Sequence, residues 1–81
     1  MKRFEKGKTY YCRMTVDYDS VLYYYIDRRT KKSVWITGGV DQHHKRRKVT
    51  SRDGVEFIDP EGRFSMSPIL RADKPEEEAK K

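Results

Sequence analysis

Residues 21–37 read Val-Leu-Tyr-Tyr-Tyr-Ile-Asp-Arg-Arg-Thr-Lys-Lys-Ser-Val-Trp-Ile-Thr, and this stretch decides the fold. Apolar and other residues alternate with a period of two in both halves, which is the side-chain period of a β-strand. The apolar residues that share one side are Leu22, Tyr24 and Ile26 in the first half, and Val34 and Ile36 in the second. Polar residues 29–32 separate the halves. The stretch therefore predicts a hairpin of two strands, 21–27 and 33–37.

The same alternation continues before and after this hairpin. From Thr9 onward every second residue is apolar or aromatic, and Gly38-Gly39 ends the hairpin's second strand. Residues 45–52 predict a fourth, very polar strand whose only aliphatic residue is Val49. An edge strand that carries many Lys and Arg residues resists edge-to-edge aggregation.

Turn residues mark the last strands. Asp53-Gly54 predicts a tight hairpin, because both residue types tolerate positive φ angles. Asp59-Pro60-Glu61-Gly62 has the residue order of a type I turn. Residues 63–67 predict a sixth short strand, and Ile69-Leu70 a single tight turn that plugs one end of the core.

Six short strands predict an all-β fold: a small, strongly bent antiparallel sheet or an SH3-like or OB-like barrel of five or six strands. Closure of such a barrel removes exposed strand edges. The side chains expected to point inward are Tyr10, Cys12, Met14, Val16, Leu22, Tyr24, Ile26, Val34, Ile36, Val49, Val55, Phe57, Phe64, Met66 and Leu70. We expect one domain over residues 1–72 and a disordered, charged tail over residues 73–81.

Composition narrows the class of protein. Charged residues make up 40% of the 81 residues and hydrophobic ones 35%, but six Tyr, three Phe and one Trp supply buried area that disordered chains lack. Residues 1–72 hold 16 Lys and Arg against 9 Asp and Glu. A positive body favours anionic partners, although a basic composition also simply improves solubility. The single cysteine excludes an internal disulfide, and no apolar run has the length of a membrane span, so we expect a cytoplasmic protein.

The first candidate binding feature is the basic run 43–48, His-His-Lys-Arg-Arg-Lys. In an extended strand Arg46 and Lys48 point one way, and Lys45 and Arg47 the other. On an edge strand both sets would reach solvent and hold successive phosphates. The alternative is that the run only protects the edge.

The second candidate is a set of aromatic residues on the opposite phase to the core: Tyr11, Tyr23, Tyr25 and Trp35. Aromatic rings flanked by cations form a platform on which unpaired bases stack. The same rings would also suit a protein-binding surface, or pack against one another or against the segment around Phe4.

The sequence gives less support to a catalytic or metal-binding function. Adjacent His43 and His44 face opposite sides of an extended chain, and Cys12 falls on the core phase, so no three ligands converge on a zinc ion. Nucleophilic catalysis would need an exposed, activated thiol, and Cys12 is predicted to be buried. We therefore expect neither an enzyme nor a cofactor.

Three segments carry a resemblance to known sequences: residues 7–13, residues 53–56 and residues 62–72, the last reading Gly-Arg-Phe-Ser-Met-Ser-Pro-Ile-Leu-Arg-Ala. Together they resemble a group of short uncharacterised bacterial proteins often carried on conjugative or integrated mobile elements. The resemblance implies a bacterial cytoplasm and an accessory role. It implies no activity and no functional residue, and it does not extend to the basic run.

These features together favour a non-enzymatic binding module with nucleic acid, either DNA or RNA, as its partner. The residues expected to hold phosphates or contact bases are Lys45, Arg46, Arg47, Lys48, Arg13, Arg28, Arg29, Tyr23, Tyr25 and Trp35. The alternative is a protein-interaction adaptor of a mobile element that uses the aromatic face. The two hypotheses differ in whether the basic run and the aromatic rings share one face.

Overall fold

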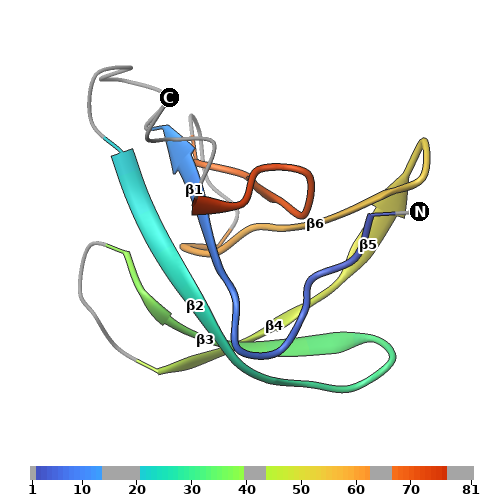
Figure 1. The fold of residues 1–81 in the computed structure, drawn as a ribbon, viewed down its shortest axis with the longest axis horizontal. Coiled ribbons are helices and arrows are strands. Elements are labelled where there is room, and N and C mark those ends of the chain that lie inside the picture. The colour runs from blue at the N-terminus through green and yellow to red at the C-terminus, as the bar shows by residue number, and fades with distance from the viewer. Residues whose placement is uncertain (1, 14–20, 40–43, 63–66, 77–81) are drawn as a thin grey trace.

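A computed structural model describes residues 2–13, 21–39, 44–62 and 67–76, and these residues form two antiparallel sheets (Figure 1). The strands of the first sheet lie in the order β1-β2-β3-β4 and those of the second in the order β5-β6-β7. Their bounds are β1 (Thr9–Arg13), β2 (Val21–Arg29), β3 (Ser33–Gly38), β4 (Lys45–Lys48), β5 (Thr50–Arg52), β6 (Val55–Ile58) and β7 (Leu70–Arg71). The prediction of an all-β fold is confirmed.

The β2–β3 hairpin forms as predicted and contains one irregularity. Ile26 pairs with Ile36, but the next pair joins Arg28 to Trp35, so Asp27 is an extra residue on β2. A β-bulge of this kind shifts the side-chain phase of the strand beyond it. As a result, Ile26 and Arg29 both face the inner side of the sheet, while Arg28 faces outward.

The predicted fourth strand proves to be two strands in different sheets. β4 pairs with β3, and β5 pairs with β6. The chain crosses between the sheets at Val49, whose N–H donates to the Lys32 carbonyl at 2.8 Å. In Figure 1 the two strands follow one another along a ribbon that rises from the lower left, at β4, to the right side, at β5.

No closed barrel is found among the described strands, so the barrel prediction is not confirmed. The segment that follows β7 contacts β1 of the four-stranded sheet. Tyr10 forms an isolated bridge with Pro75, and the Tyr11 N–H donates to the Lys74 carbonyl at 3.0 Å. Residues 73–76, the described part of the predicted tail, thus lie along β1.

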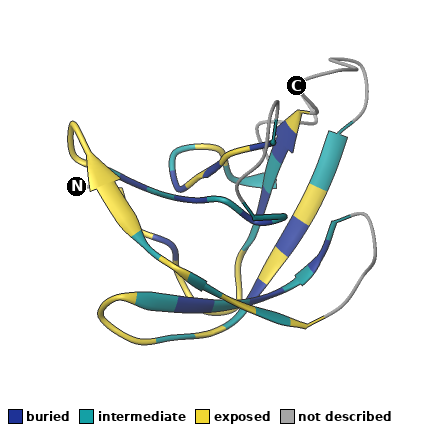
Figure 2. Cartoon of the chain, turned by 180° about the vertical axis from the view of Figure 1, so that it is seen from behind, coloured by how far each residue is buried: buried dark blue, intermediate teal, exposed yellow. Residues whose placement is uncertain are grey.

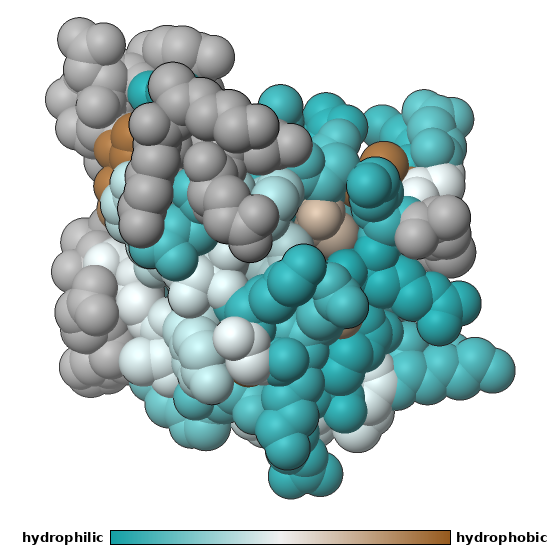
Figure 3. All heavy atoms as spheres, in the orientation of Figure 1, coloured by the Kyte–Doolittle hydropathy of each residue, from teal (hydrophilic) through white to brown (hydrophobic). Residues whose placement is uncertain are grey.

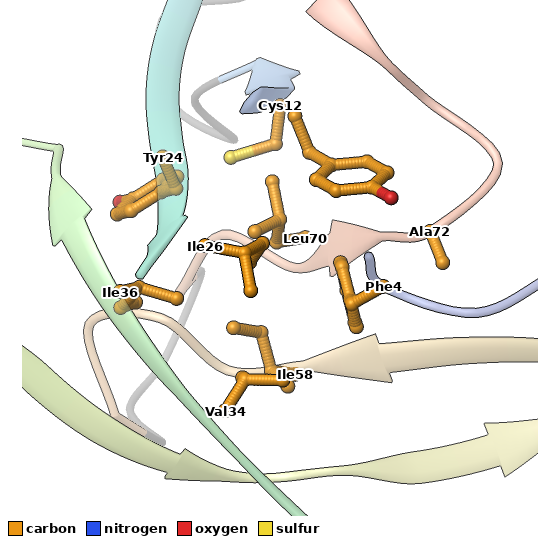
Figure 4. Packing of buried hydrophobic residues seen from close by; sticks show 10 residues of the cluster. Phe4, Cys12, Tyr24, Ile26, Val34, Ile36, Ile58, Leu70 and Ala72 are labelled. Carbon is orange, nitrogen blue, oxygen red and sulfur yellow. The ribbon is translucent and has the colours of Figure 1, made fainter. Parts of the chain in front are cut away.

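The core lies between the two sheets and is drawn in Figure 4. Its buried residues are Phe4, Tyr10, Cys12, Tyr24, Ile26, Val34, Ile36, Ile58, Leu70 and Ala72, with Leu22 and Val49 packed against them. The predicted inward phase is therefore correct for β1, β2 and β3, and Figure 2 shows the alternation of buried and exposed residues along β2. Of the remaining predicted core residues, Met14, Val16, Phe64 and Met66 lie outside the described residues, as do positions 63–66 of the predicted sixth strand.

Phe4 is a core residue that the alternation does not predict. Its ring meets the Tyr10 ring edge-on, with the centroids 5.0 Å apart and the planes at 82°. Backbone bonds fix the segment around it to both sheets: the Lys2 N–H donates to the Gly54 carbonyl, and the Gly7 N–H to the Ile26 carbonyl. The N-terminal segment thereby closes one side of the core.

The predicted phase of β6 is wrong. Glu56 and Ile58 are buried, whereas Val55 and Phe57 are half-buried on the other side. The sequence Val-Glu-Phe-Ile places apolar residues on both phases, so alternation alone does not decide between them. An ion pair at Glu56 makes the inward carboxylate compatible with burial, and Ile58 then fills the core.

Both predicted turns are present. Asp53 and Gly54 have φ angles of 54° and 78° and join β5 to β6, and the Gly62 N–H donates to the Asp59 carbonyl at 3.1 Å. Ile69-Leu70 is not the predicted tight turn. Leu70 begins the short strand β7 and is fully buried, while Ile69 is exposed.

Candidate functional site

The outer face of the four-stranded sheet brings together most of the predicted aromatic residues. Tyr11 pairs with Tyr23 across β1 and β2, Tyr25 pairs with Thr37 across β2 and β3, and Trp35 lies on the same side of β3. Tyr23 and Tyr25 are 41% and 44% exposed, which is unusual for rings of this size. Stacking partners from outside the protein would reach these two rings without any rearrangement.

A shallow depression is lined by both tyrosines. It has a volume of about 360 Å³, and its other lining residues come from β1, β2 and the end of β3, with Gly38 and the following Gly39 among them. A side chain at Gly38 would lie 2.2 Å from the Tyr23 carbonyl oxygen, and both glycines have positive φ angles. The two glycines thus allow the end of β3 to lie against β2 and the Tyr24 ring.

The basic run divides between the two sides of β4. Arg46 pairs with Trp35 and Lys48 with Ser33, so both face outward, and both are exposed. The outward half of the run therefore shares a face with the aromatic rings.

The inward half has protein partners. Lys45 Nζ lies 2.8 Å from Glu61 Oε1, and both side chains are only 15% exposed. Arg47 Nε donates to the Pro60 carbonyl at 3.0 Å. Glu61 also accepts a hydrogen bond from the Tyr24 hydroxyl at 2.6 Å. Lys45 and Arg47 thus attach β4 to the turn that follows β6.

Two arginines flank Trp35 on the outer face. Arg28 Cζ lies 4.5 Å from the centroid of the Trp35 ring, and Arg46 is its partner on β4. A guanidinium over a Trp ring is held by cation–π attraction, worth about 0.5–1 kcal/mol when exposed. Arg28 is thereby positioned while its N–H groups stay accessible to an anion.

Among the described residues of this face, Asp27 at the bulge carries a carboxylate. Asp27 accepts a hydrogen bond from the Thr37 hydroxyl, and its Oδ2 lies 3.3 Å from His44 Nε2. His44 is thus tied to the sheet by Asp27. Asp27 places a negative charge between the tyrosine pair and the Trp35 cluster, so an anion would approach the two ends of the face more readily than its middle.

Arg29, next to Arg28 in the sequence, lies on the inner side. Its Nη1 is 2.7 Å from Glu56 Oε1 and 2.7 Å from the Phe4 carbonyl oxygen, and Glu56 Oε1 also accepts from the Phe4 N–H at 2.8 Å. Burial alone would raise the pKa of Glu56, but the hydrogen bonds from Arg29 and Phe4 outweigh it and lower that pKa. Arg29 is therefore occupied in holding the N-terminal segment.

The predicted site residues thus fall into two groups. Those on the outer face are Tyr23, Tyr25, Arg28, Trp35, Arg46 and Lys48, with Arg13 at the end of β1. Those on the inner side are Arg29, Lys45 and Arg47. Sequence reasoning missed the partners Glu56 and Glu61, although an acidic residue within an apolar strand and another at a turn were visible signals.

Cys12 does not have the environment of a nucleophile. Burial, together with the nearby Glu61 charge, raises the pKa of its thiol to about 12, so the thiolate is scarce at neutral pH. No group of three His, Cys, Asp or Glu residues within the described ranges is arranged to hold a metal ion.

Comparison with models of protein families, with curated proteins and with solved structures gives no match. The resemblance to short bacterial proteins of mobile elements therefore stays a prediction. Within the described part of the chain, no helix is long and apolar enough to cross a bilayer.

Proposed function

We propose that the chain is a non-enzymatic nucleic-acid-binding module that prefers single strands and uses the outer face of the four-stranded sheet. The observation that carries the proposal is the strand register, which places exposed tyrosines and exposed cations on one face. Proteins that bind single strands combine these two elements, because rings stack with bases while cations hold the backbone.

Each part of the face has a separate role in this proposal. Tyr23 and Tyr25 stack with bases, and the depression between them accommodates the edge of a ring. Arg46 and Lys48 hold phosphates, since neither makes an ion pair with any described residue. Arg28 extends the cationic part across Trp35.

Single strands fit this face better than a duplex. Bases in a duplex are already stacked on one another, so their faces cannot meet Tyr23 and Tyr25. Stacking of an unpaired base contributes about 1–3 kcal/mol, whereas phosphate contacts alone serve both forms. A bent two-sheet module related to SH3-like or OB-like barrels would present its face in the same way.

Replacement of the tyrosines tests this proposal. In the double variant Tyr23→Ala/Tyr25→Ala, affinity for an oligothymidylate falls by about 1–3 kcal/mol per stacked base, while affinity for a duplex is nearly unchanged. The control is Tyr23→Phe/Tyr25→Phe, which keeps both rings and retains affinity. Fluorescence anisotropy at low salt measures both. Equal loss in the Ala and Phe variants, or no single-strand binding by the wild type, would contradict the proposal.

A protein-interaction adaptor is the second candidate. Tyr, Trp and Arg are also the residues that dominate protein–protein binding energy. Ile69, 51% exposed, lies with Val55 and Phe57 around a groove of about 460 Å³ on the second sheet. If the wild type binds no nucleic acid at low ionic strength, this groove, whose apolar residues are rimmed by Arg and Asp, and the aromatic face become the surfaces to test against proteins.

A further inference from the structure

A second basic surface lies away from the aromatic face, in an open groove of about 1210 Å³. One wall is the N-terminal segment, residues 2–8, and the other is the β2–β3 turn with the start of β5. Seven Lys or Arg residues and three acidic residues line it, which leaves a formal charge of +4. Figure 3 shows hydrophilic side chains over this part of the molecule.

Most of the positive charge in this groove is not neutralised by the protein. Lys8 is paired with Glu5 at 2.9 Å, and Arg29 with Glu56 at 2.7 Å. Five exposed cations make no ion pair with any described residue: Lys2, Arg3, Lys6, Lys31 and Lys32. Like charges gathered around one concave surface repel one another, and a bound polyanion relieves that repulsion.

The floor and walls of the groove are fixed before any ligand binds. Arg29 connects β2 to the Phe4 carbonyl and to Glu56 on β6. The Glu56 N–H donates to the Lys2 carbonyl at 3.0 Å, and the Ile26 N–H donates to the Lys8 carbonyl at 2.9 Å. Because the backbone of the groove is held by such bonds, the ordering cost on binding is confined to its exposed Lys and Arg side chains.

The groove is continuous with the outer face of the four-stranded sheet. Lys48 faces outward beside Ser33, and the next residue, Val49, lines the groove. The Val49 N–H donates to the carbonyl of Lys32, another lining residue. A nucleic-acid strand whose phosphates contact Arg46 and Lys48 therefore reaches Lys31 and Lys32 when it continues around the β2–β3 turn.

We propose that this groove holds the sugar-phosphate backbone of the single strand whose bases stack on the outer face. Its volume exceeds that of common small-molecule pockets, about 300–1,000 Å³, and its charge is spread along both walls, as an extended polyanion requires. The inference rests on the proposed function. It adds that a long strand occupies two surfaces, whereas a short one occupies only the aromatic face.

Oligonucleotide length separates the two surfaces. The variant Lys6→Gln/Lys31→Gln/Lys32→Gln removes three exposed groove cations and no described ion pair. With oligothymidylates of about 16 nucleotides, the slope of log affinity against log salt concentration becomes shallower by about 2 than in the wild type. With oligothymidylates of about 4 nucleotides, affinity and slope stay close to those of the wild type. Thermal unfolding of the triple variant stays as in the wild type, which shows that the fold is intact.

The outcomes distinguish the groove from the aromatic face. If the triple variant binds both lengths as the wild type does, the groove proposal is wrong and the proposed function stands. Suppose instead that the triple variant loses affinity equally for the long and the short oligonucleotide, while Tyr23→Ala/Tyr25→Ala alters the affinity for neither. The groove is then the principal site, and the proposed role of the aromatic face is wrong. If polyglutamate binds the wild type as tightly as the long oligonucleotide and responds equally to the triple variant, the groove recognises acidic protein segments instead.

Discussion

The two sides of the four-stranded sheet use the same residue types for different purposes. On the inner side, Arg29 and Lys45 are paired with Glu56 and Glu61, and the aromatic Tyr24 is fully buried. On the outer side, Arg28 and Arg46 lie beside the half-buried Trp35 ring, and Tyr23 and Tyr25 are exposed on the same face. A basic, tyrosine-rich sequence therefore divides into residues with protein partners and residues that face solvent only once the strand phase is known.

The largest expected effect comes from the inner side of the sheet. Ile26→Asp places an unpaired charge at a position with no exposed area, and we expect the loss of cooperative unfolding. Tyr25→Asp, one residue away on the outer side, is the matched control and should cost about 1 kcal/mol, because it changes strand propensity at an exposed site. Urea denaturation followed by circular dichroism measures both. Equal damage from the two changes would show that the phase of β2 is wrong.

Arg28 and Arg29 allow the outer and inner sides of the sheet to be compared at two adjacent residues. Arg29→Gln leaves the buried Glu56 carboxylate without its cation, and we expect a loss of about 2–4 kcal/mol in the free energy of unfolding. Arg28→Gln removes an exposed cation–π contact and should cost less than about 1 kcal/mol. The bulge at Asp27 shifts the phase of β2, so Arg29 and not Arg28 faces inward. A larger loss from Arg28→Gln than from Arg29→Gln would contradict this account.

We expect low pH to reduce the free energy of unfolding through Glu56, on the inner side of the sheet. The pKa of Glu56 is lowered in the folded protein, so the unfolded chain takes up a proton first as the pH falls below the ordinary glutamate value of about 4.3. The stability that Glu56 contributes is thus present above that pH and is lost as the pH falls towards its folded-state pKa. Glu56→Gln should be less stable at neutral pH and should lose less stability between neutral and acidic pH. Urea titrations measure the free energy of unfolding at each pH. If it changes with pH by the same amount in the wild type and in Glu56→Gln, this role of Glu56 is refuted.

The sequence predicted the regular parts of the fold and failed where partners decide the structure. Alternation found the β2–β3 hairpin and the inward phase of β1, β2 and β3, because these strands carry apolar residues on one phase. It failed for β6, where both phases hold apolar residues and the Glu56–Arg29 pair determines which faces inward. It also treated residues 45–52 as one strand, since no local signal at Val49 marks a change of sheet.

The sequence predicted the residue types of the candidate site and several of its members, but not which of the predicted residues face inward. Tyr23, Tyr25 and Trp35 lie on the expected face, and the alternate directions of the basic run are as predicted. Arg29, Lys45 and Arg47 have protein partners, which no spacing rule reveals because those partners are distant in sequence. The groove along residues 2–8 went unnoticed for the same reason: its cations come from two segments that are distant in sequence, residues 2–8 and residues 29–32.

The most direct test of the central claim compares two pairs of exposed cations in salt-dependent binding to a single strand. Arg46→Gln/Lys48→Gln removes the outward cations of β4, and Arg52→Gln/Lys74→Gln removes the same charge elsewhere. Binding to an oligothymidylate, measured over a range of salt concentrations, should show a log–log slope shallower by about 1.4 for the first variant and nearly unchanged for the second. Equal slopes for both variants would show that net charge, and not the outer face of the four-stranded sheet, accounts for binding.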